Sequence, residues 1–239
     1  MSVADKTGFE TLQVIEKATR FNQWMYSVIA PYCQGEILEI GSGIGNISRL
    51  FAEAGDFITL SDTDPGYVSI LQSKFNNSDN VREILSIDIL EKNFNQVYSR
   101  NCGKYDCLVM LNVLEHLPDE ELALRNCYSL LKENGSIIIL VPAYAWLYSR
   151  MDRELGHVKR YTTRSLNDAL KNVRLTPVKD FYFNSLGIGA WLYAKWAHLD
   201  KIPSSEMKLF DRLTSIAKWI DRLLFHKAGL SAICIAKKN

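Results

Sequence analysis

The sequence lacks the segments that would mark a membrane-spanning, secreted or zinc-stabilised protein. Its longest apolar stretch, Leu186 to Leu199, is shorter than the roughly 20 residues that a membrane-spanning helix needs, and it contains Lys195. Residues 1–20 lack the apolar core of a signal peptide, so we expect a cytoplasmic protein. The 5 cysteines are odd in number and lack the paired spacing of metal ligands. We therefore expect reduced core cysteines and no metal site.

Charge is balanced over the whole chain but not along it. The net charge is +1, yet residues 1–149 carry 11 basic against 19 acidic side chains, and residues 150–239 carry 17 against 8. A basic C-terminal part favours an anionic partner, either a phosphate-bearing substrate or a membrane surface. Attraction between the two halves of the protein is the alternative. Because the sequence has no basic domain or base-stacking motif, we expect no nucleic-acid partner.

Apolar runs with β character alternate with helical patterns, which predicts an α/β fold with a mostly parallel seven-stranded sheet. The runs at 107–111 and 137–141 are continuously apolar, as is typical of strands that helices cover on both faces. Strands are expected at residues 36–41, 57–61, 82–87, 105–111, 136–141, 178–183 and 231–236, and helices at 8–32, 46–54, 65–75 and 119–132, with two more within 184–229.

A glycine-rich turn follows the first predicted strand. The run from Glu36 to Gly45 reads EILEIGSGIG, so glycines stand at positions 41, 43 and 45. Glycine lets the backbone turn sharply and approach a ligand closely because it has no Cβ. Such a turn beside a parallel sheet suits a nucleotide-like cofactor. A dinucleotide-binding turn would have its third glycine at Asn46, which argues against an NAD-dependent enzyme.

Two acidic residues follow the second predicted strand. Asp62 lies 21 positions after Gly41, and an ionised carboxylate there can accept hydrogen bonds from both hydroxyls of a ribose. The alternative is that Asp62 or Asp64 merely caps the helix that begins at Pro65. We interpret Asp64 as the cap and Asp62 as the ligand.

Four runs stand in order within residues 35–142: Glu36–Gly45, Thr59–Pro65, Leu85–Ile89 and Met110–Pro118. Together they resemble the motifs of class I S-adenosylmethionine-dependent methyltransferases. The resemblance implies a Rossmann-like fold, S-adenosylmethionine as cofactor and S-adenosylhomocysteine as product. It also implies that Asp88 accepts from the adenine amino group. The residues expected to bind the cofactor are Trp24, Glu39, Gly41, Ser42, Gly43, Gly45, Asp62, Thr63, Asp88, Ile89, Asn112 and Val113.

The acceptor side is predicted from two later segments. His116 and His157 are the histidines placed to act as a general base, and Tyr161 is a third candidate for catalysis. For His116 a structural hydrogen bond is the alternative, and for the loop around His157 it is capping and packing. The pattern D-R-x-x-G-H-x-x-R-Y, which starts at Asp152, resembles a subgroup of methyltransferases found beside or fused to polyprenyl-phosphate-type glycosyltransferases.

Four regions are expected: an N-terminal helical lid at 1–34, a cofactor-binding core at 35–183, a helical insertion at 184–229 that caps the acceptor side, and the last strand at 230–239. Within the insertion, the helix at about 205–225 is amphipathic. Packing onto its own domain is the first explanation, and peripheral contact with a membrane is the alternative. Its expected apolar stripe is Phe210, Leu213, Ala217, Ile220 and Leu224.

The function expected from these observations is methyl transfer to a small-molecule acceptor or one linked to a lipid or glycan. Two other classes remain as alternatives. One is a non-catalytic module that holds the cofactor or a partner protein, and the other is an NAD-dependent oxidoreductase. The sequence leaves the acceptor, the methylated atom and the oligomeric state open, because one scaffold of this kind serves many acceptors.

Overall fold

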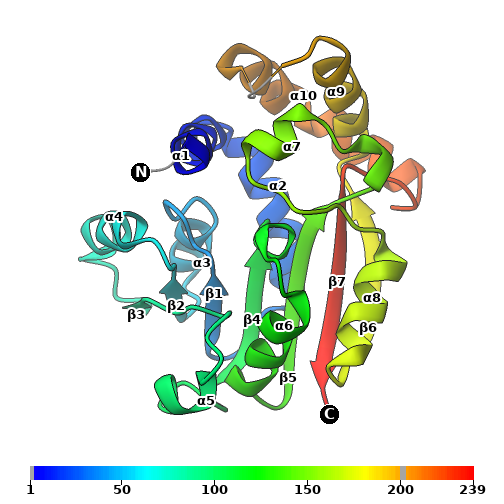
Figure 1. Ribbon diagram of the computed structural model, residues 1–239. Helices are drawn as coiled ribbons and strands as arrows, with labels where there is room; N and C mark the ends of the chain where they lie inside the picture. Colours follow the sequence, from blue (N-terminus) through cyan, green and yellow to red (C-terminus); the bar gives the residue numbers. More distant parts are fainter. Residues whose placement is uncertain (1–2, 200–202) are drawn as a thin grey trace.

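The protein contains a seven-stranded sheet with the strand order β3-β2-β1-β4-β5-β7-β6 (Figure 1). The computed structural model describes residues 3–199 and 203–239. Strand β7 runs antiparallel to β5 and β6, and the other pairings are parallel. The predicted mostly parallel sheet is therefore confirmed. The strands are β1 (Ile37–Ile40), β2 (Ile58–Ser61), β3 (Val81–Leu85), β4 (Tyr105–Leu111), β5 (Leu131–Pro142), β6 (Leu175–Phe183) and β7 (Ser231–Lys238).

Helices cover both faces of the sheet because neighbouring strand residues point to opposite sides. Ile139 belongs to a buried cluster with side chains of α6 and α8, whereas Ile138 belongs to a second cluster with side chains of α2 and α3. The helices are α1 (Val3–Glu16), α2 (Thr19–Ile29), α3 (Ser48–Ala54), α4 (Pro65–Phe75), α5 (Phe94–Val97), α6 (Glu120–Leu130), α7 (Arg150–Glu154), α8 (Thr163–Asn172), α9 (Ser185–Trp196) and α10 (Ser204–Leu223).

The boundary between α6 and β5 differs from the prediction. The helix expected to reach residue 132 ends at Leu130, and β5 begins at Leu131 rather than at 136. Leu131 pairs with Tyr105 at the start of β4, which extends the strand beyond its continuously apolar part. Asn134 takes a φ of 65° within this segment, a conformation that asparagine tolerates better than most residues.

The N-terminal segment expected as one helix at 8–32 is two helices, α1 and α2, which meet around Ala18. The side chain of Asn22 donates to the carbonyl of Ile15 over 2.8 Å. The same carbonyl, in the last turn of α1, also accepts from the backbone N–H of Ala18 over 2.9 Å, so Asn22 adds a second hydrogen bond at the end of the helix. The break is therefore stabilised by a polar side chain that apolar periodicity alone does not reveal.

Helices α9 and α10 lie between β6 and β7, as the predicted insertion requires, and Figure 1 shows them beyond the carboxyl ends of the parallel strands. Ala217 of α10 is buried against the sheet, and Asp211 accepts from the backbone N–H of Phe21 over 2.9 Å. Leu224 departs from the expected stripe because it lies after the helix and is exposed. Within the described residues, no helix has the length and apolar character needed to cross a membrane.

Candidate functional site

A cavity of about 1050 Å³ lies at the carboxyl ends of β1, β2 and β4. Its lining comes from the glycine turn after β1, from the segments that follow β2 and β4, and from residues of α1, α2, α9 and α10. Open α/β sheets bind their ligands at this edge, because the loops that follow parallel strands meet there. The position of the cavity therefore matches the predicted cofactor site.

The three glycines of the turn have different surroundings. Gly41 and Gly43 line the cavity with φ angles of 72° and 55°. A Cβ on Gly41 would lie 2.4 Å from Cγ2 of Val113, so any larger residue would displace the segment after β4. A Cβ on Gly45 would instead lie 2.6 Å from the Phe75 ring, and Gly45 is not part of the cavity lining. Gly45 permits close packing of the turn against α4 rather than contact with a ligand.

The two acids after β2 are placed differently: the predicted cap at Asp64 is confirmed, and ligand binding by Asp62 stays a prediction. Asp64 caps α4 by accepting from the backbone N–H groups of Gly66 and Tyr67. Asp62 lines the cavity and accepts from the backbone N–H of Gly43 over 2.9 Å. Burial is the main cause that raises the pKa of Asp62 above its usual value. Because an ionised carboxylate can accept several hydrogen bonds, Asp62 retains capacity for a ligand.

Glu39 provides a second carboxylate at the base of the turn. It is a buried residue of β1, it lines the cavity, and it accepts a hydrogen bond from the Ser48 hydroxyl. Burial raises the pKa of Glu39 to about 7, and hydrogen bonds from Ser48 and Ser42 oppose that shift. Glu39 can thus change protonation state near neutral pH, or be ionised by a cationic ligand group.

Most of the remaining predicted cofactor residues also line the cavity. They are Ser42 in the turn, Thr63 after β2, Asp88 and Ile89 after β3, and Asn112 and Val113 after β4. Asp88 is exposed and Ile89 is buried, so they offer a polar edge beside an apolar surface. That combination suits a flat heteroaromatic ring that carries an amino group.

Trp24 does not reach the cavity. It is 3% exposed, and the centroid of its ring lies 4.3 Å from the centroid of the Phe183 ring in the core. The cavity side of α2 is formed by Phe21, Asn22 and Met25, which share one face of the helix. The expectation that Trp24 binds the cofactor finds no support in this placement, because the helix turns it toward the sheet.

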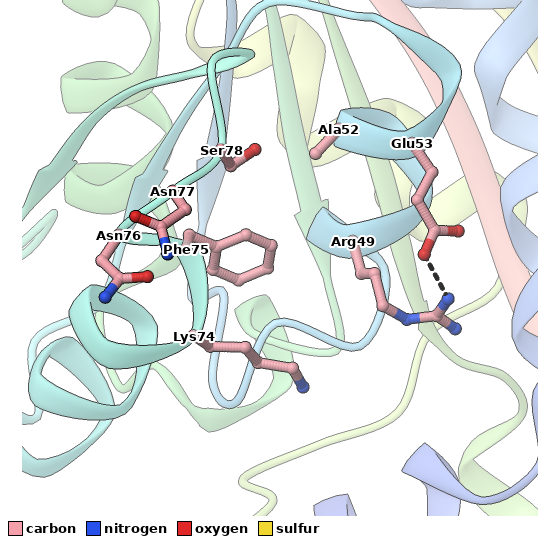
Figure 2. Close-up of a pocket in the computed structure, with 8 residues that line it drawn as sticks. All are labelled: Arg49, Ala52, Glu53, Lys74, Phe75, Asn76, Asn77 and Ser78. Atoms are coloured by element: carbon pink, nitrogen blue, oxygen red, sulfur yellow. Dashed lines mark hydrogen bonds and ion pairs between the residues drawn. The ribbon is translucent and has the colours of Figure 1, made fainter.

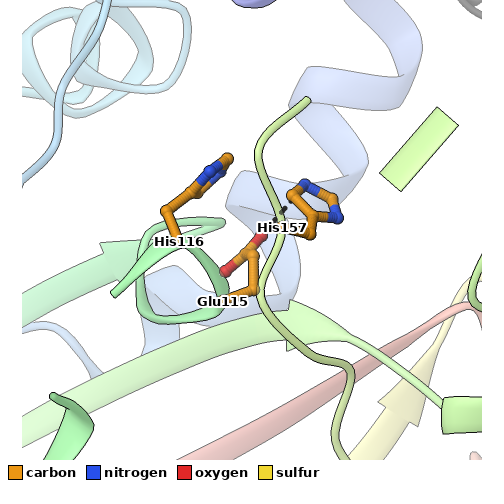
Figure 3. Close-up of side chains that lie close together, drawn as sticks. All are labelled: Glu115, His116 and His157. Carbon is orange, nitrogen blue, oxygen red and sulfur yellow. Dashed lines mark ion pairs between the residues drawn. The ribbon is translucent and has the colours of Figure 1, made fainter. Parts of the chain in front are cut away.

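A second part of the cavity lining is polar and includes Glu115, His116 and His157, which Figure 3 shows, together with Arg160. The fully buried Asp152 of α7 lies 2.8 Å from Nδ1 of His157 and accepts from Nε of Arg160 over 2.7 Å. In the tautomer that donates from Nδ1 to Asp152, Nε2 of His157 is the free acceptor nitrogen. That nitrogen lies 4.0 Å from Oε1 of Glu115.

Burial is the main influence on the protonation states of Glu115 and His116. Glu115 is fully buried, and within the described chain neither of its carboxylate oxygens has a hydrogen-bond partner. Burial raises the pKa of Glu115 to about 8, although the Arg160 guanidinium opposes the shift. Burial, with His157 adding a smaller effect, lowers the pKa of His116 to about 4. At neutral pH His116 is therefore uncharged and a weak base.

Tyr161 lies outside the cavity lining and belongs to the core. It is 2% exposed, and its hydroxyl donates to Glu120 over 3.0 Å. Burial and the nearby Glu120 raise its pKa above the usual value. This placement does not support contact with a substrate. The hydroxyl instead ties the segment after α7 to the start of α6.

Glu115, His116 and His157 also offer ligand atoms within 4.8 Å of one another, so among the described residues they form the cluster that could hold a metal ion. One carboxylate and two imidazoles are common ligands of zinc and non-haem iron. However, the guanidinium of Arg160 acts electrostatically on Glu115 and is ion-paired to Asp152. A metal ion would add a second positive charge there, which favours a proton-accepting role for His157.

Asp152 and Glu115 are the site residues that the sequence reasoning missed. Asp152 begins the D-R-x-x-G-H-x-x-R-Y pattern, and the structure explains that pattern, because one buried carboxylate holds both His157 and Arg160. The signal was present as an acid five positions before a histidine.

A separate hollow of about 360 Å³ near Lys74, shown in Figure 2, contains an Arg49–Glu53 ion pair but none of the predicted site residues.

Residues 15–179 match the profile of the family described as methyltransferase domain. The chain belongs to this family. Membership confirms the predicted class I S-adenosylmethionine-dependent methyltransferase domain. A ubiquinone biosynthesis O-methyltransferase from Escherichia coli O9:H4 (strain HS) is 22% identical over 142 residues, which are 58% of this chain and 56% of that protein. The chain thus spans little more than half the length of this curated relative.

Solved methyltransferase structures share the fold. A SAM-dependent methyltransferase from Archaeoglobus fulgidus aligns with a TM-score of 0.57 and 18% identity, covering 91% of this chain and 94% of that one. Phosphoethanolamine N-methyltransferase 2 from Haemonchus contortus, in complex with S-adenosyl-L-methionine, aligns with a TM-score of 0.58 and 14% identity, covering 86% of this chain and 49% of that one. At these identities the likeness confirms the Rossmann-like fold alone.

Proposed function

We propose that this methyltransferase-family protein transfers a methyl group from S-adenosylmethionine to a hydroxyl oxygen of a largely apolar acceptor, either a small molecule or a lipid-linked one. The observation that carries the proposal is that one cavity contains both halves of such a site. The turn at Gly41 and the carboxylate of Asp62 line it together with His157, whose free nitrogen can accept a proton.

The residues that line the cavity suit the parts of this cofactor. Gly41 and Gly43 present backbone without a side chain, and Asp62 can accept from the ribose hydroxyls. Glu39 would pair with the cofactor's ammonium group, which would favour the ionised carboxylate. Asp88 and Ile89 offer the polar and apolar contacts that the adenine ring needs. The glycine turn after β1 is preformed, since the backbone N–H of Gly43 already donates a hydrogen bond to Asp62.

The acceptor step depends on His157 and on the surroundings of its imidazole. When bound, S-adenosylmethionine supplies a sulfonium methyl group whose bond to sulfur breaks as the acceptor oxygen attacks, leaving S-adenosylhomocysteine. His157 Nε2 accepts the proton that the acceptor hydroxyl loses. Asp152 holds the imidazole in place through Nδ1 and stabilises the imidazolium that forms. The relation to the ubiquinone biosynthesis O-methyltransferase, whose name states O-methylation, supports oxygen as the methylated atom.

The lining of the cavity supports an apolar acceptor. Helices α1, α2, α9 and α10 contribute mainly apolar side chains around the polar group at His157. A site of this kind binds by burying apolar surface, while a few polar groups set the orientation of the ligand. The apolar contributors include Leu12, Ile15, Phe21, Met25, Trp191, Met207 and Phe210.

Calorimetry with S-adenosylmethionine and with NAD tests this function and its alternatives. We expect the wild type to bind S-adenosylmethionine in preference to NAD, and Asp62→Ala to weaken that binding roughly 10- to 100-fold, because a hydrogen bond to a charged group contributes about 1.5–3 kcal/mol. Asp168→Ala is the matched control, since Asp168 is an exposed acid of α8 that does not line the cavity and should leave affinity unchanged. Preferential NAD binding would favour the oxidoreductase, and tight cofactor binding without methyl transfer to oxygen, nitrogen or carbon acceptors would favour the non-catalytic module.

Activity should survive removal of divalent metal. After treatment with EDTA and gel filtration, we expect methyl transfer from labelled S-adenosylmethionine to proceed at the untreated rate, because His157 uses Nε2 as a base rather than as a ligand. Adding Zn²⁺ should inhibit, since the metal would compete for the same nitrogen. Loss of activity in EDTA that returns with a divalent metal would instead assign Glu115, His116 and His157 as ligands.

A further inference from the structure

Helices α9 and α10 carry a concentration of exposed apolar side chains. Within the described chain, nine of the fourteen large apolar side chains that are exposed fall within residues 192–225. On α10, Leu209, Ile216 and Leu223 recur every seven residues, and Trp219 lies on the same side. Single exposed apolar residues are ordinary, but a continuous stripe marks an interaction surface. The sequence predicted only the inward stripe of this helix, so α10 is apolar on two sides.

Helix α9 extends this surface. Leu192, Tyr193 and Trp196 share one side of α9, and Trp196 is 79% exposed. The two helices pack against each other. We define the docking face as these exposed side chains of α9 together with the outward stripe of α10. Its members are Leu192, Tyr193, Trp196, Leu209, Ile216, Trp219 and Leu223.

On α9 and α10, most acidic side chains are turned inward and most basic side chains are exposed. Asp221 is fully buried and accepts from the backbone N–H groups of Asn184 and Ser185, each over 2.7 Å. Asp211 points inward to the Phe21 amide. Among the described residues of α9, α10 and the turn that follows, Glu206 is the exposed acid. The exposed bases are Lys195, Lys208, Arg212, Arg222 and Lys227.

We propose that the docking face binds the surface of an anionic lipid membrane. Leu and Trp side chains on one side of a helix enter the boundary between headgroups and acyl chains, while neighbouring Lys and Arg side chains attract anionic headgroups. A second copy of the chain would bring the same positive charge to the contact, whereas anionic lipid brings the complementary one. The charge of the face therefore selects a membrane over self-association.

This surface lies on the outer side of the helices that wall the cavity. Ala190, Trp191 and Ala194 of α9, and Met207 and Phe210 of α10, line the cavity from within. A membrane-bound protein would thus hold its acceptor pocket one helix thickness from the bilayer. An apolar acceptor dissolves in that bilayer and would be close to the pocket. The inference goes beyond the proposed function and does not depend on it, because membrane binding can be measured without turnover.

The experiment is sedimentation of the full chain with sucrose-loaded vesicles of phosphatidylcholine, with and without phosphatidylglycerol. We expect sedimentation with the anionic vesicles, little with phosphatidylcholine alone, and release by high salt. Lys208→Ala/Arg212→Ala should lower the partition coefficient roughly thirtyfold, because each cation near an anionic surface contributes about fivefold. Leu209→Ser/Trp219→Ser should lower it at least about tenfold.

Matched controls place the effect on the docking face. Arg164→Ala/Lys171→Ala removes two exposed bases from α8, and Val178→Ser removes an exposed apolar residue from β6, so both should sediment like the wild type. All variants should bind S-adenosylmethionine with wild-type affinity. Absence of sedimentation with anionic vesicles, or equal losses in the controls, would overturn the proposal. Lipid-free dimers that disappear in Leu209→Ser/Trp219→Ser would also overturn it, since a second copy would then cover the face.

Discussion

Replacing His157 by asparagine is expected to lower kcat about 10²- to 10⁴-fold and to leave the affinity for S-adenosylmethionine unchanged, which is the range that general-base catalysis contributes. The asparagine amide can still donate to Asp152 from near the position of Nδ1, so the loop and the ion pair between Asp152 and Arg160 remain. Only the acceptor nitrogen Nε2 is lost. The measurements are initial rates with labelled cofactor and, separately, calorimetric binding.

Two other variants separate this role from general damage to the site. Tyr161→Phe should keep nearly full kcat and lose some thermal stability, because the Tyr161 hydroxyl bonds to Glu120 within the core. His116→Asn should reduce kcat less than His157→Asn, since burial holds the pKa of His116 at about 4. Asp152→Asn is a poorer test because Asp152 also binds Arg160. Unchanged kcat in His157→Asn would show that the acceptor loses its proton elsewhere or carries none to lose.

The parts of the site that the sequence revealed are those in which local backbone chemistry decides the structure. Gly41 needs a positive φ and has no room for a Cβ, and Asp64 caps the helix three residues after the strand it follows. Such constraints restrict which residue types can occupy these positions, so the residue types themselves reveal the local structure. The presence of the strands and of helices on both faces follows from apolar runs that are just as local.

The sequence failed where the packing of distant segments decides which way a side chain points. Trp24 and Met25 are adjacent in α2. The Trp24 ring packs against Phe183, whereas Met25 lines the cavity. Tyr161 lies four residues from His157 but turns to Glu120. The outward stripe of α10 was equally hidden, because helical periodicity does not tell which of two apolar sides meets the sheet.

The stability of the cofactor-free protein should fall as pH rises from about 6.5 to 8, and Glu115 should be the main cause. Burial raises its pKa from 4.5 to about 8, so the native state holds a proton that the unfolded state has released over this range. Stability from a raised pKa is complete below the unfolded value and is lost as pH rises through the folded one. One proton is worth about 1.36 kcal/mol per pH unit, so the free energy of unfolding should drop by about 2 kcal/mol across this window.

Denaturant unfolding of the wild type and of Glu115→Gln at each pH isolates this effect, since the amide does not titrate. The difference between the two free energies should change by about 2 kcal/mol, equivalent to roughly 4–8 °C in Tm for a chain of this size. The window starts at 6.5 because the lowered pKa of His116 gives the opposite slope between about 4 and 6.5. Glu39→Gln is the matched control, because the Glu39 pKa of about 7 places most of its slope below this window. Parallel curves for wild type and Glu115→Gln would mean that the buried carboxyl is ionised throughout, and then a cation must be paired with it.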